Sequence, residues 1–439
     1  MELRKEAAPM KSIRFIITIL LGVFLLSGCT LSSAPSGVET LGSRYAPVKE
    51  DEPDFAYPQS ALLTPKASGG NSSSQDELRG VWISYLELGF QGLDEAAASA
   101  RLASMFDQIS AFGLNTVFFQ VRPFADALYP TELFPFSHLL TGEQGKDPGY
   151  DLLQLAVTAA HERGLKLHAW LNPYRIQLNT GEVLVPEALD TDGPYAKWSE
   201  AGWVVQTGSG QYLNPGIAEV RDLIARGAAE VVSRYGVDGV QFDDYFYPDD
   251  FGDSDQAQYD AYVAAGGALS RDDWRREQVN ELMKAVYSAV KAANSAAVFG
   301  VSPAADIEKN YANKYADVAK WGSEPGYVDY LMPQDYFGFE NAKMPFEAVA
   351  EEWSKLVTAP EVRYYLGLAA YKTGEEDAYA GTGKGEWQTH DDILKRQVEY
   401  SRQIANCDGF SIYSYSSLFG ENPNAIRQTE RNNLSSLLK

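Results

Sequence analysis

From about Glu77 onward, short apolar runs alternate with longer amphipathic stretches, and this alternation limits the possible folds more than any other feature. We expect strands at eight places, which begin near Arg79, Asn115, Lys166, Gly239, Val298, Val328, Arg363 and Gly409. Stretches with helical periodicity, such as "EAAASARLASMFDQISAFG", lie between most of these runs, and several of them end at a glycine. The repeat predicts an α/β fold, a (β/α)8 TIM barrel over residues 77–439. A doubly wound open sheet is the rival, but no G-x-G-x-x-G motif follows the first strand.

The first 76 residues have the composition of a targeting and linker region. Basic residues precede the apolar run "FIITILLGVFLL", which ends in "LSGC" at Cys29. This order resembles a bacterial lipoprotein signal, so we predict a signal peptide over residues 1–28, lipidation of Cys29 and an extracytoplasmic, membrane-anchored protein of the cell envelope. An uncleaved transmembrane anchor is the alternative, although the run is shorter than the ~20 residues that a span needs. Residues 29–76 are rich in Ser, Pro, Gly and Ala, which predicts a flexible tether.

The charge and composition narrow the classes of partner. The formal net charge is −23, so binding to nucleic acid or directly to an anionic membrane surface is electrostatically unfavourable. The 26 Tyr, 20 Phe and 8 Trp residues supply aromatic faces, which suit an uncharged sugar chain and also fill large cores. The four histidines and two cysteines show no metal-ligand spacing, so no metal and no cofactor is predicted. The acidic loop from Pro248 to Gln256 does not match the spacing of a calcium loop, and no obligate protein partner is inferred.

Polar side chains follow the expected strands at their carboxyl ends, where the active site of such a barrel lies. Alternation along the fourth strand directs Val240 and Phe242 outward, so Asp243 faces the barrel axis and Asp244 lies at the rim. The same alternation directs further side chains inward. The strand-end residues that we expect to bind substrate are Gln120, Arg122, Asn172, Tyr174, Tyr245, Gln334, Tyr336 and Tyr413.

Cleavage of a glycosidic bond commonly requires two carboxyl groups. Because neighbours on a strand point to opposite sides, Asp243 and Asp244 do not easily flank one bond, and a second carboxyl from another strand is expected. The candidates are Asp126, Glu87 and Asp335. A structural role for these carboxyls, in helix capping or in pairing with Arg122 or Arg175, is the alternative.

Seven motifs between Glu77 and about Phe419 carry a resemblance to a known family. They read "ELRGVWIS", "GLNTVFFQVRPFADALYP", "HAWLNPYR", "VDGVQFDDYFYP", "WRREQVN", "FGVSP" and "LMPQDYF". The chain resembles the glycosyl hydrolase-like 10 family of bacterial envelope proteins. The resemblance implies a TIM-barrel glycoside hydrolase acting on envelope glycan, with peptidoglycan strands as the substrate class. It maps the family's shared positions onto Arg122, Asp126, Asn172, Tyr174, Arg175, Asp243, Asp244, Tyr245 and Gln334.

The chain departs from the family pattern in two places. Asn214 stands where Asp is expected, and Asp335 falls where relatives tend to be apolar, which favours Asp126 over Asp335 as the second carboxyl. "DGVQFDDY" is also similar to the strand-four signature of family 18 chitinases, but Tyr245 stands at the position of their catalytic Glu.

We therefore predict a glycoside hydrolase with Asp243, Asp244 and Asp126 as catalytic residues. A lipid-anchored, non-catalytic glycan-binding or scaffold protein on the same fold is the alternative, and cleavage of the same strands without water is a third possibility.

Overall fold

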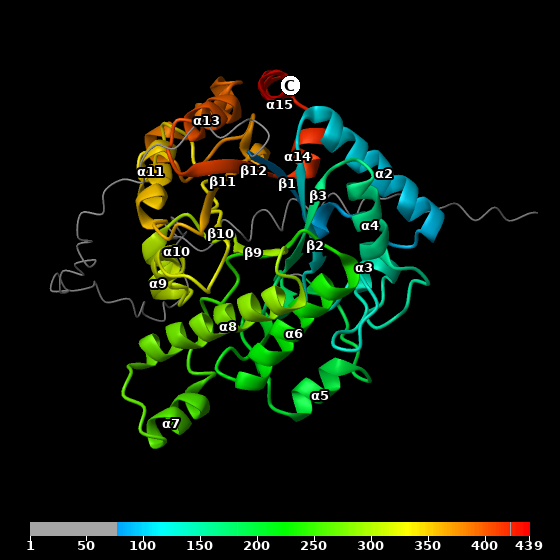
Figure 1. Ribbon diagram of the computed structural model, residues 1–439, viewed down its shortest axis with the longest axis vertical. Helices are drawn as coiled ribbons and strands as arrows, with labels where there is room; N and C mark the ends of the chain where they lie inside the picture. Colours follow the sequence, from blue (N-terminus) through cyan, green and yellow to red (C-terminus); the bar gives the residue numbers. More distant parts are fainter. Residues whose placement is uncertain (1–76, 182, 422) are drawn as a thin grey trace, which may run out of the picture. The chain divides into compact units, whose positions relative to one another are not determined.

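The computed structural model describes residues 77–181, 183–421 and 423–439, and its centre is a closed barrel of eight parallel strands. The strands around the barrel follow the order β1-β12-β11-β10-β9-β8-β3-β2. Each strand therefore pairs with its neighbours along the chain once the inserted elements are set aside, as the (β/α)8 prediction requires. The barrel strands are β1 Leu78–Ile83, β2 Thr116–Arg122, β3 Lys166–Leu171, β8 Gly239–Phe242, β9 Val298–Val301, β10 Tyr330–Leu331, β11 Arg363–Ala369 and β12 Cys407–Tyr413. The predicted fold is confirmed, and every barrel strand overlaps one of the apolar runs (Figure 1).

A helix of the outer layer follows each barrel strand. These helices are α2 Glu95–Phe112, α4 Leu152–His161, α6 Ala218–Tyr235, α8 Arg271–Ala293, α10 Val318–Ser323, α11 Phe346–Leu356, α13 Ile393–Ser401 and α15 Ala425–Leu438. Their ends follow local sequence signals. Asp94 caps α2 by accepting a hydrogen bond from the backbone N–H of Ala97, and Gly113 ends the helix in the left-handed conformation.

Further helices, of three to nine residues, occupy the connections. They are η1 Tyr85–Glu87, α3 His138–Thr141, α5 Pro194–Glu200, α7 Gln256–Ala264, α9 Ile307–Asn313, η2 Ala370–Lys372, η3 Gly381–Gly383, α12 Glu386–Thr389 and α14 Tyr415–Phe419.

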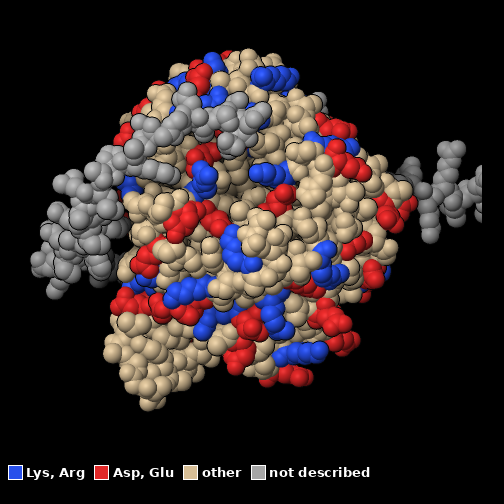
Figure 2. Space-filling model, in the orientation of Figure 1, with Lys and Arg blue, Asp and Glu red and all other residues tan. Residues whose placement is uncertain are grey.

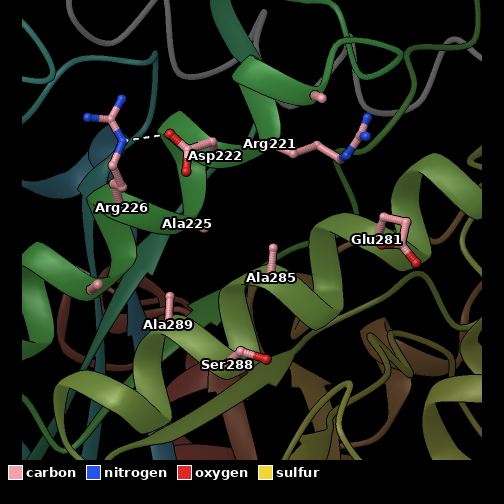
Figure 3. Close-up of a pocket in the computed structure, with 10 residues that line it drawn as sticks. Arg221, Asp222, Ala225, Arg226, Glu281, Ala285, Ser288 and Ala289 are labelled. Carbon is pink, nitrogen blue, oxygen red and sulfur yellow. Dashed lines mark ion pairs between the residues drawn. The ribbon is translucent and has the colours of Figure 1, made fainter.

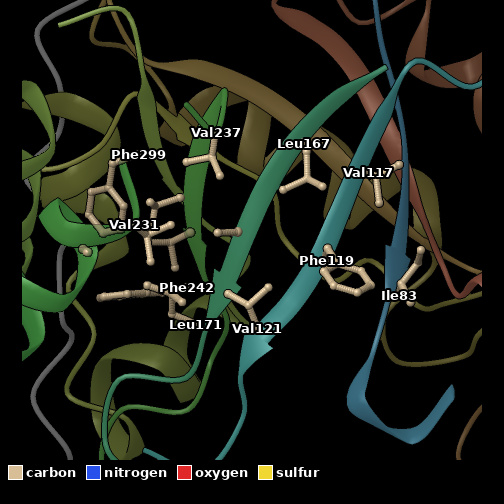
Figure 4. Packing of buried hydrophobic residues seen from close by; sticks show 14 of the residues in the cluster. Ile83, Val117, Phe119, Val121, Leu167, Leu171, Val231, Val237, Phe242 and Phe299 are labelled. Carbon is tan, nitrogen blue, oxygen red and sulfur yellow. The ribbon is translucent and has the colours of Figure 1, made fainter. Parts of the chain in front are cut away.

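The main core lies between the barrel and the helices. Val117, Phe119 and Val121 of β2 point outward into it, as do Leu167 of β3 and Phe242 of β8 (Figure 4). The alternate side chains fill the barrel interior, where Trp82, Phe118, Trp170, Tyr330 and Met332 form a separate apolar cluster. The period of two in the strands thus produces one layer of core on each side of the sheet.

A second, four-stranded antiparallel sheet is inserted between β3 and α6, and the sequence did not predict it. Its order is β5-β4-β7-β6, with β4 Arg175–Asn179, β5 Leu184–Val185, β6 Val204–Gln206 and β7 Gly210–Leu213. The strands are two to five residues long and contain Gln, Asn and Gly, so they show no clear apolar alternation. Backbone pairing rather than side-chain pattern identifies them.

Charged side chains of both signs are interspersed over α6 and α8 on the face shown in Figure 2. The lobe at the lower left, where Figure 1 places α7, is largely uncharged on the same face, and Val263 and Leu269 are exposed there. No helix within the described ranges is both long and apolar enough to cross a membrane. The predicted signal peptide, Cys29 and the tether lie outside the described residues.

Candidate active site

Asp243 follows directly after β8 and is buried at the mouth of the barrel, with 2% of its surface exposed. Two side chains from β3 and its end donate hydrogen bonds to its Oδ2 atom: Nε1 of Trp170 at 2.9 Å and Nδ2 of Asn172 at 2.8 Å. The backbone N–H of Tyr245 lies 3.3 Å from Oδ1. The carboxyl group is therefore fixed in one orientation, and the predicted inward placement of Asp243 is confirmed.

Buried amides support this arrangement from below. Nε2 of Gln120 on β2 donates a 2.5 Å hydrogen bond to Oδ1 of Asn172, and Oε1 of Gln120 accepts one from the backbone N–H of Tyr85 at 2.8 Å. Gln120 and Asn172 are almost fully buried. Their polar groups are engaged by the protein, so the structure places these two predicted substrate-binding residues as supports for Asp243.

Asp244 faces the opposite part of the mouth. Its Oδ1 atom accepts a 3.1 Å hydrogen bond from Nε2 of Gln334, which also donates to the backbone oxygen of Ser302 at 3.0 Å. Asp243 continues the inward alternation of β8, whereas Asp244 lies one residue further beyond the end of the strand at Phe242, where alternation no longer governs the direction of its side chain. Both carboxyls can therefore contact residues around the mouth: Asp243 on the β3 side and Asp244 beyond β9.

The surroundings of Asp243 favour its protonated form more strongly than water does for an exposed aspartate. Burial, and then the neighbouring charge of Asp244, raise the pKa of Asp243 from 3.8 to about 7, although Arg175 and the Trp170 hydrogen bond oppose the rise. Burial also raises the pKa of Asp244, against Lys314 and the hydrogen bond from Gln334. A carboxyl with a pKa near 7 changes its charge at neutral pH, which suits proton transfer.

Aromatic side chains line the other side of the mouth. Tyr336, Tyr371 and Tyr413 lie 5.9–6.0 Å apart by their ring centroids and are half-buried. The ring centroid of Trp82 on β1 lies 6.3 Å from that of Tyr413. The predicted residues Tyr336 and Tyr413 thus belong to one aromatic wall beside the polar groups, as expected for a sugar-binding cleft.

The predicted inward orientation of Arg122 is wrong. Between Gln120 and Arg122 the pairing of β2 with β3 shifts by one residue, so Arg122 pairs with the outward-facing Leu171. Its guanidinium lies over the ring of Phe134 at 4.3 Å, close to Gly227 of α6. Arg122 therefore belongs to the helix side of the barrel wall.

Tyr174 is also directed away from the mouth. It is fully buried in the main core, where its electrostatic neighbours include Arg221 of α6 and Tyr247. β3 ends at Leu171 and β4 begins at Arg175 after Pro173, so the barrel alternation does not extend to Tyr174. In this position Tyr174 is not directed toward the mouth, so the structure does not support the predicted contact of Tyr174 with substrate.

The three candidates for a second carboxyl on another strand lie in other surroundings than the Asp243–Asp244 pair. Asp126 is buried, and its Oδ2 lies 3.4 Å from Nδ1 of His138. Glu87 accepts hydrogen bonds from Ser84, Ser414 and Ser416, which tie η1 to the turn after β12. Asp335 is buried near Tyr364 on the helix side. Among the described residues none of the three forms a hydrogen bond or ion pair with Asp243 or Asp244.

The sequence prediction named Arg175 as a shared family position and as a possible structural partner of the carboxyls, and it assigned neither Arg175 nor Trp170 a catalytic or substrate-binding role. Trp170 could have been found, because it shares the inward face of β3 with Asn172. Arg175 lay in a quoted motif, but its position depends on rings from three separate loops, which no local pattern reveals.

A groove in the outer layer lies apart from this site. The groove, of about 520 Å3, runs between α6 and α8, lined by Ala225, Ala285 and Ala289 with the Arg226–Asp222 ion pair at its edge (Figure 3). None of its lining residues is a predicted site residue. Within the part of the chain that the structure describes, no cluster of three or more His, Cys, Asp or Glu residues could hold a metal ion.

Comparison with known proteins now assigns the family. Residues 77–380 match the model of the family described as Glycosyl hydrolase-like 10. The chain belongs to this family. This glycosyl hydrolase-like chain is 36% identical over 382 residues to glycosyl hydrolase YngK of Bacillus subtilis, covering 82% of this chain and 72% of YngK. It is 33% identical over 394 residues to glycosyl hydrolase DigH of Escherichia coli K12, covering 81% of this chain and 88% of DigH.

Solved structures with low sequence identity share the fold of this family member. An α-L-fucosidase isoenzyme 2 from Paenibacillus thiaminolyticus superposes with a TM-score of 0.51 at 14% identity, covering 82% of this chain and 49% of the fucosidase. An endo-1,4-β-mannanase from Rhizomucor miehei superposes with a TM-score of 0.50 at 13% identity, covering 82% of this chain and 94% of the mannanase. The family and the named relatives make the protein a glycoside hydrolase, as predicted, in preference to a non-catalytic scaffold.

Proposed function

We propose that this glycoside hydrolase cleaves the glycan of the cell envelope, with peptidoglycan strands as substrate and with Asp243 and Asp244 as its catalytic carboxyls. The observation that carries the proposal is Asp243, a buried carboxyl at the barrel mouth with two side-chain donors on one oxygen and a pKa of about 7. Asp126 is not assigned a catalytic role, because its Oδ2 faces Nδ1 of His138 and not the carboxyl pair.

The two carboxyls divide the chemistry of hydrolysis between them. One, as the acid, transfers its proton to the glycosidic oxygen as the bond to the sugar carbon breaks. The other, as the carboxylate, either takes a proton from the attacking water or bonds to the sugar carbon until water replaces it. Like charges on neighbouring residues favour a state with one proton shared between the pair, which provides one acid and one base.

The aromatic wall and the half-buried amide of Gln334 favour a sugar chain as substrate. Tyr336 and Tyr413 offer faces for sugar rings, while Tyr245 and Gln334 supply polar atoms beside the carboxyls. The motifs shared with envelope proteins and the lipoprotein-like leader support an envelope glycan over a soluble one.

Incubation of the full-length protein with peptidoglycan strands, with and without stem peptides, tests this function. We expect mass spectrometry to detect new reducing ends, and Asp243→Asn to abolish them without loss of folding. Asp260→Asn is the matched control, because Asp260 is exposed on α7 and, among the described residues, accepts a hydrogen bond only from Gln256 one turn earlier in the same helix. Activity that survives Asp243→Asn would refute the assignment of the catalytic carboxyl.

We also propose that lipid on Cys29 anchors the protein to the membrane. Metabolic labelling with palmitate should label the wild-type chain and leave Cys29→Ala unlabelled. Labelling of Cys29→Ala would place the lipid on another residue and refute the proposal, whereas an unlabelled wild-type chain retained in membranes through residues 1–28 would support an uncleaved anchor.

A further inference from the structure

Arg175, the first residue of β4, is held in place near Asp243. Its Nε atom donates a 3.1 Å hydrogen bond to the backbone oxygen of Pro123. Its guanidinium carbon lies 4.7 Å from the ring centroid of Phe124, 4.9 Å from that of Tyr245 and 5.6 Å from that of Tyr85. These distances are within the range of cation–π attraction.

The three rings of this clamp come from three different loops. Tyr85 follows β1, Phe124 follows β2 and Tyr245 follows β8, so the position of Arg175 depends on a large part of the barrel mouth. Tyr85 also donates its backbone N–H to Gln120, which supports Asn172 and, through it, Asp243. The clamp and the hydrogen-bond chain beneath Asp243 are therefore one connected unit.

The clamp holds the guanidinium by three aromatic rings and by the hydrogen bond of its Nε atom. Within the described residues, neither Nη1 nor Nη2 of Arg175 donates a hydrogen bond to protein, and Arg175 forms no direct ion pair with Asp243. The positive charge nevertheless acts on Asp243 through space and favours its carboxylate form. A buried guanidinium with free planar N–H groups is suited to bind oxygen atoms of a ligand.

We propose that Arg175 is a positioning and substrate-binding residue, whose aromatic clamp keeps its charge beside Asp243 while its Nη atoms bind a sugar oxygen next to the scissile bond. This inference rests on the proposed role of Asp243. It assigns to Arg175 two separable tasks: the charge sets the protonation of Asp243, and the planar N–H groups hold the substrate.

The other groups that face Asp243 are identified, so the effect of Arg175 can be isolated. Trp170 and Asn172 approach from the β3 side, Asp244 and Tyr245 from the loop after β8, and Tyr336 from the end of β10. Lys309 and Lys314 of the α9 region act on Asp244. The partners of Arg175 on its own side are Tyr85, Phe124, Tyr245 and, on β7, Tyr212.

Two substitutions separate the two tasks. In Arg175→Gln the charge is lost, so the pH midpoint of kcat/KM that reports Asp243 should move upward by about 0.5–1 unit. In Arg175→Lys the charge remains but the planar group is lost, so the midpoint should stay near the wild-type value while KM rises about tenfold.

Arg101→Gln is the matched control. Arg101 likewise donates Nε to a backbone oxygen, that of Leu88, and lies 5.6 Å from the ring of Phe90, but it belongs to α2. Its loss should change stability only, with midpoint and KM unaltered.

The outcomes distinguish the inference from the function on which it rests. If Asp243→Asn abolishes activity but Arg175→Gln leaves the midpoint in place, Arg175 does not set the protonation of Asp243, while the catalytic role of Asp243 stands. An unchanged KM in folded Arg175→Lys would remove the substrate-binding task. If Asp243→Asn remains active, the proposed catalytic function itself fails.

Discussion

Nδ2 of Asn172, just after β3, donates a 2.8 Å hydrogen bond to Oδ2 of Asp243, just after β8. The two strands are neighbours in the barrel, and Trp170 on β3 donates to the same oxygen. The carboxyl is thus held by the strand next to its own, before any substrate binds. A site fixed in this way needs little rearrangement during the reaction.

Replacement of Trp170 by Phe should raise the pKa of Asp243 further. The indole N–H stabilises the carboxylate, so its loss favours the protonated form and moves the pH midpoint of kcat/KM upward by about one unit. The matched control is Trp321→Phe, which removes an indole hydrogen bond of 2.7 Å to Asn280 in the outer layer. A midpoint that shifts equally in both variants would contradict the specific role of Trp170.

Replacement of Asp244 by Asn should have the opposite effect on Asp243. The like charge of Asp244 raises the pKa of Asp243, so its removal lowers that pKa toward the usual range. Activity should also fall by about 100-fold or more, because Asp244 is the proposed second carboxyl. Carbon-13 NMR titration of labelled Asp measures the pKa directly, with Asp243→Asn identifying the resonance. An unchanged Asp243 titration would exclude electrostatic coupling of the pair.

Asp243→Asn should stabilise the fold at neutral and alkaline pH. The folded pKa of Asp243, about 7, lies above the unfolded value of 3.8, so the folded state binds the proton more tightly. The contribution of Asp243 is therefore fully present below pH 3.8 and is lost as the pH rises through 7. The difference between the folded and unfolded pKa values corresponds to at most about 4 kcal/mol in the free energy of unfolding. Urea unfolding should show a gain from Asp243→Asn that is small near pH 4 and larger at pH 8. A gain that does not grow with pH would contradict the raised pKa.

Gly227→Ala should destabilise the protein although alanine favours helices. A Cβ atom at position 227 would overlap Nη1 of Arg122 and lie 2.6 Å from Cε2 of Phe134, in a closely packed layer. We expect a net loss of about 1–3 kcal/mol in the free energy of unfolding, measured in urea. Gly385→Ala is the control, because no atom lies within 4 Å of its Cβ position. If Gly227→Ala is more stable than the wild-type protein, Arg122 does not pack against Gly227.

The sequence by itself determined the barrel, its eight strands and the inward placement of Asp243. Apolar runs, helical periodicity and glycine stops are local signals, and strand alternation follows from backbone geometry alone. The same local reasoning found Gln120, Asn172 and Gln334 around the carboxyls, as well as the aromatic residues Tyr336 and Tyr413.

Only the tertiary structure decided the features that depend on pairing between distant segments. The shift in register between β2 and β3 turns Arg122 toward α6, and the inserted sheet removes Tyr174 from the barrel pattern. The clamp around Arg175 requires rings from three loops that are far apart in sequence. The pKa of Asp243 depends on burial by the whole barrel mouth, a property that no residue carries before the chain folds.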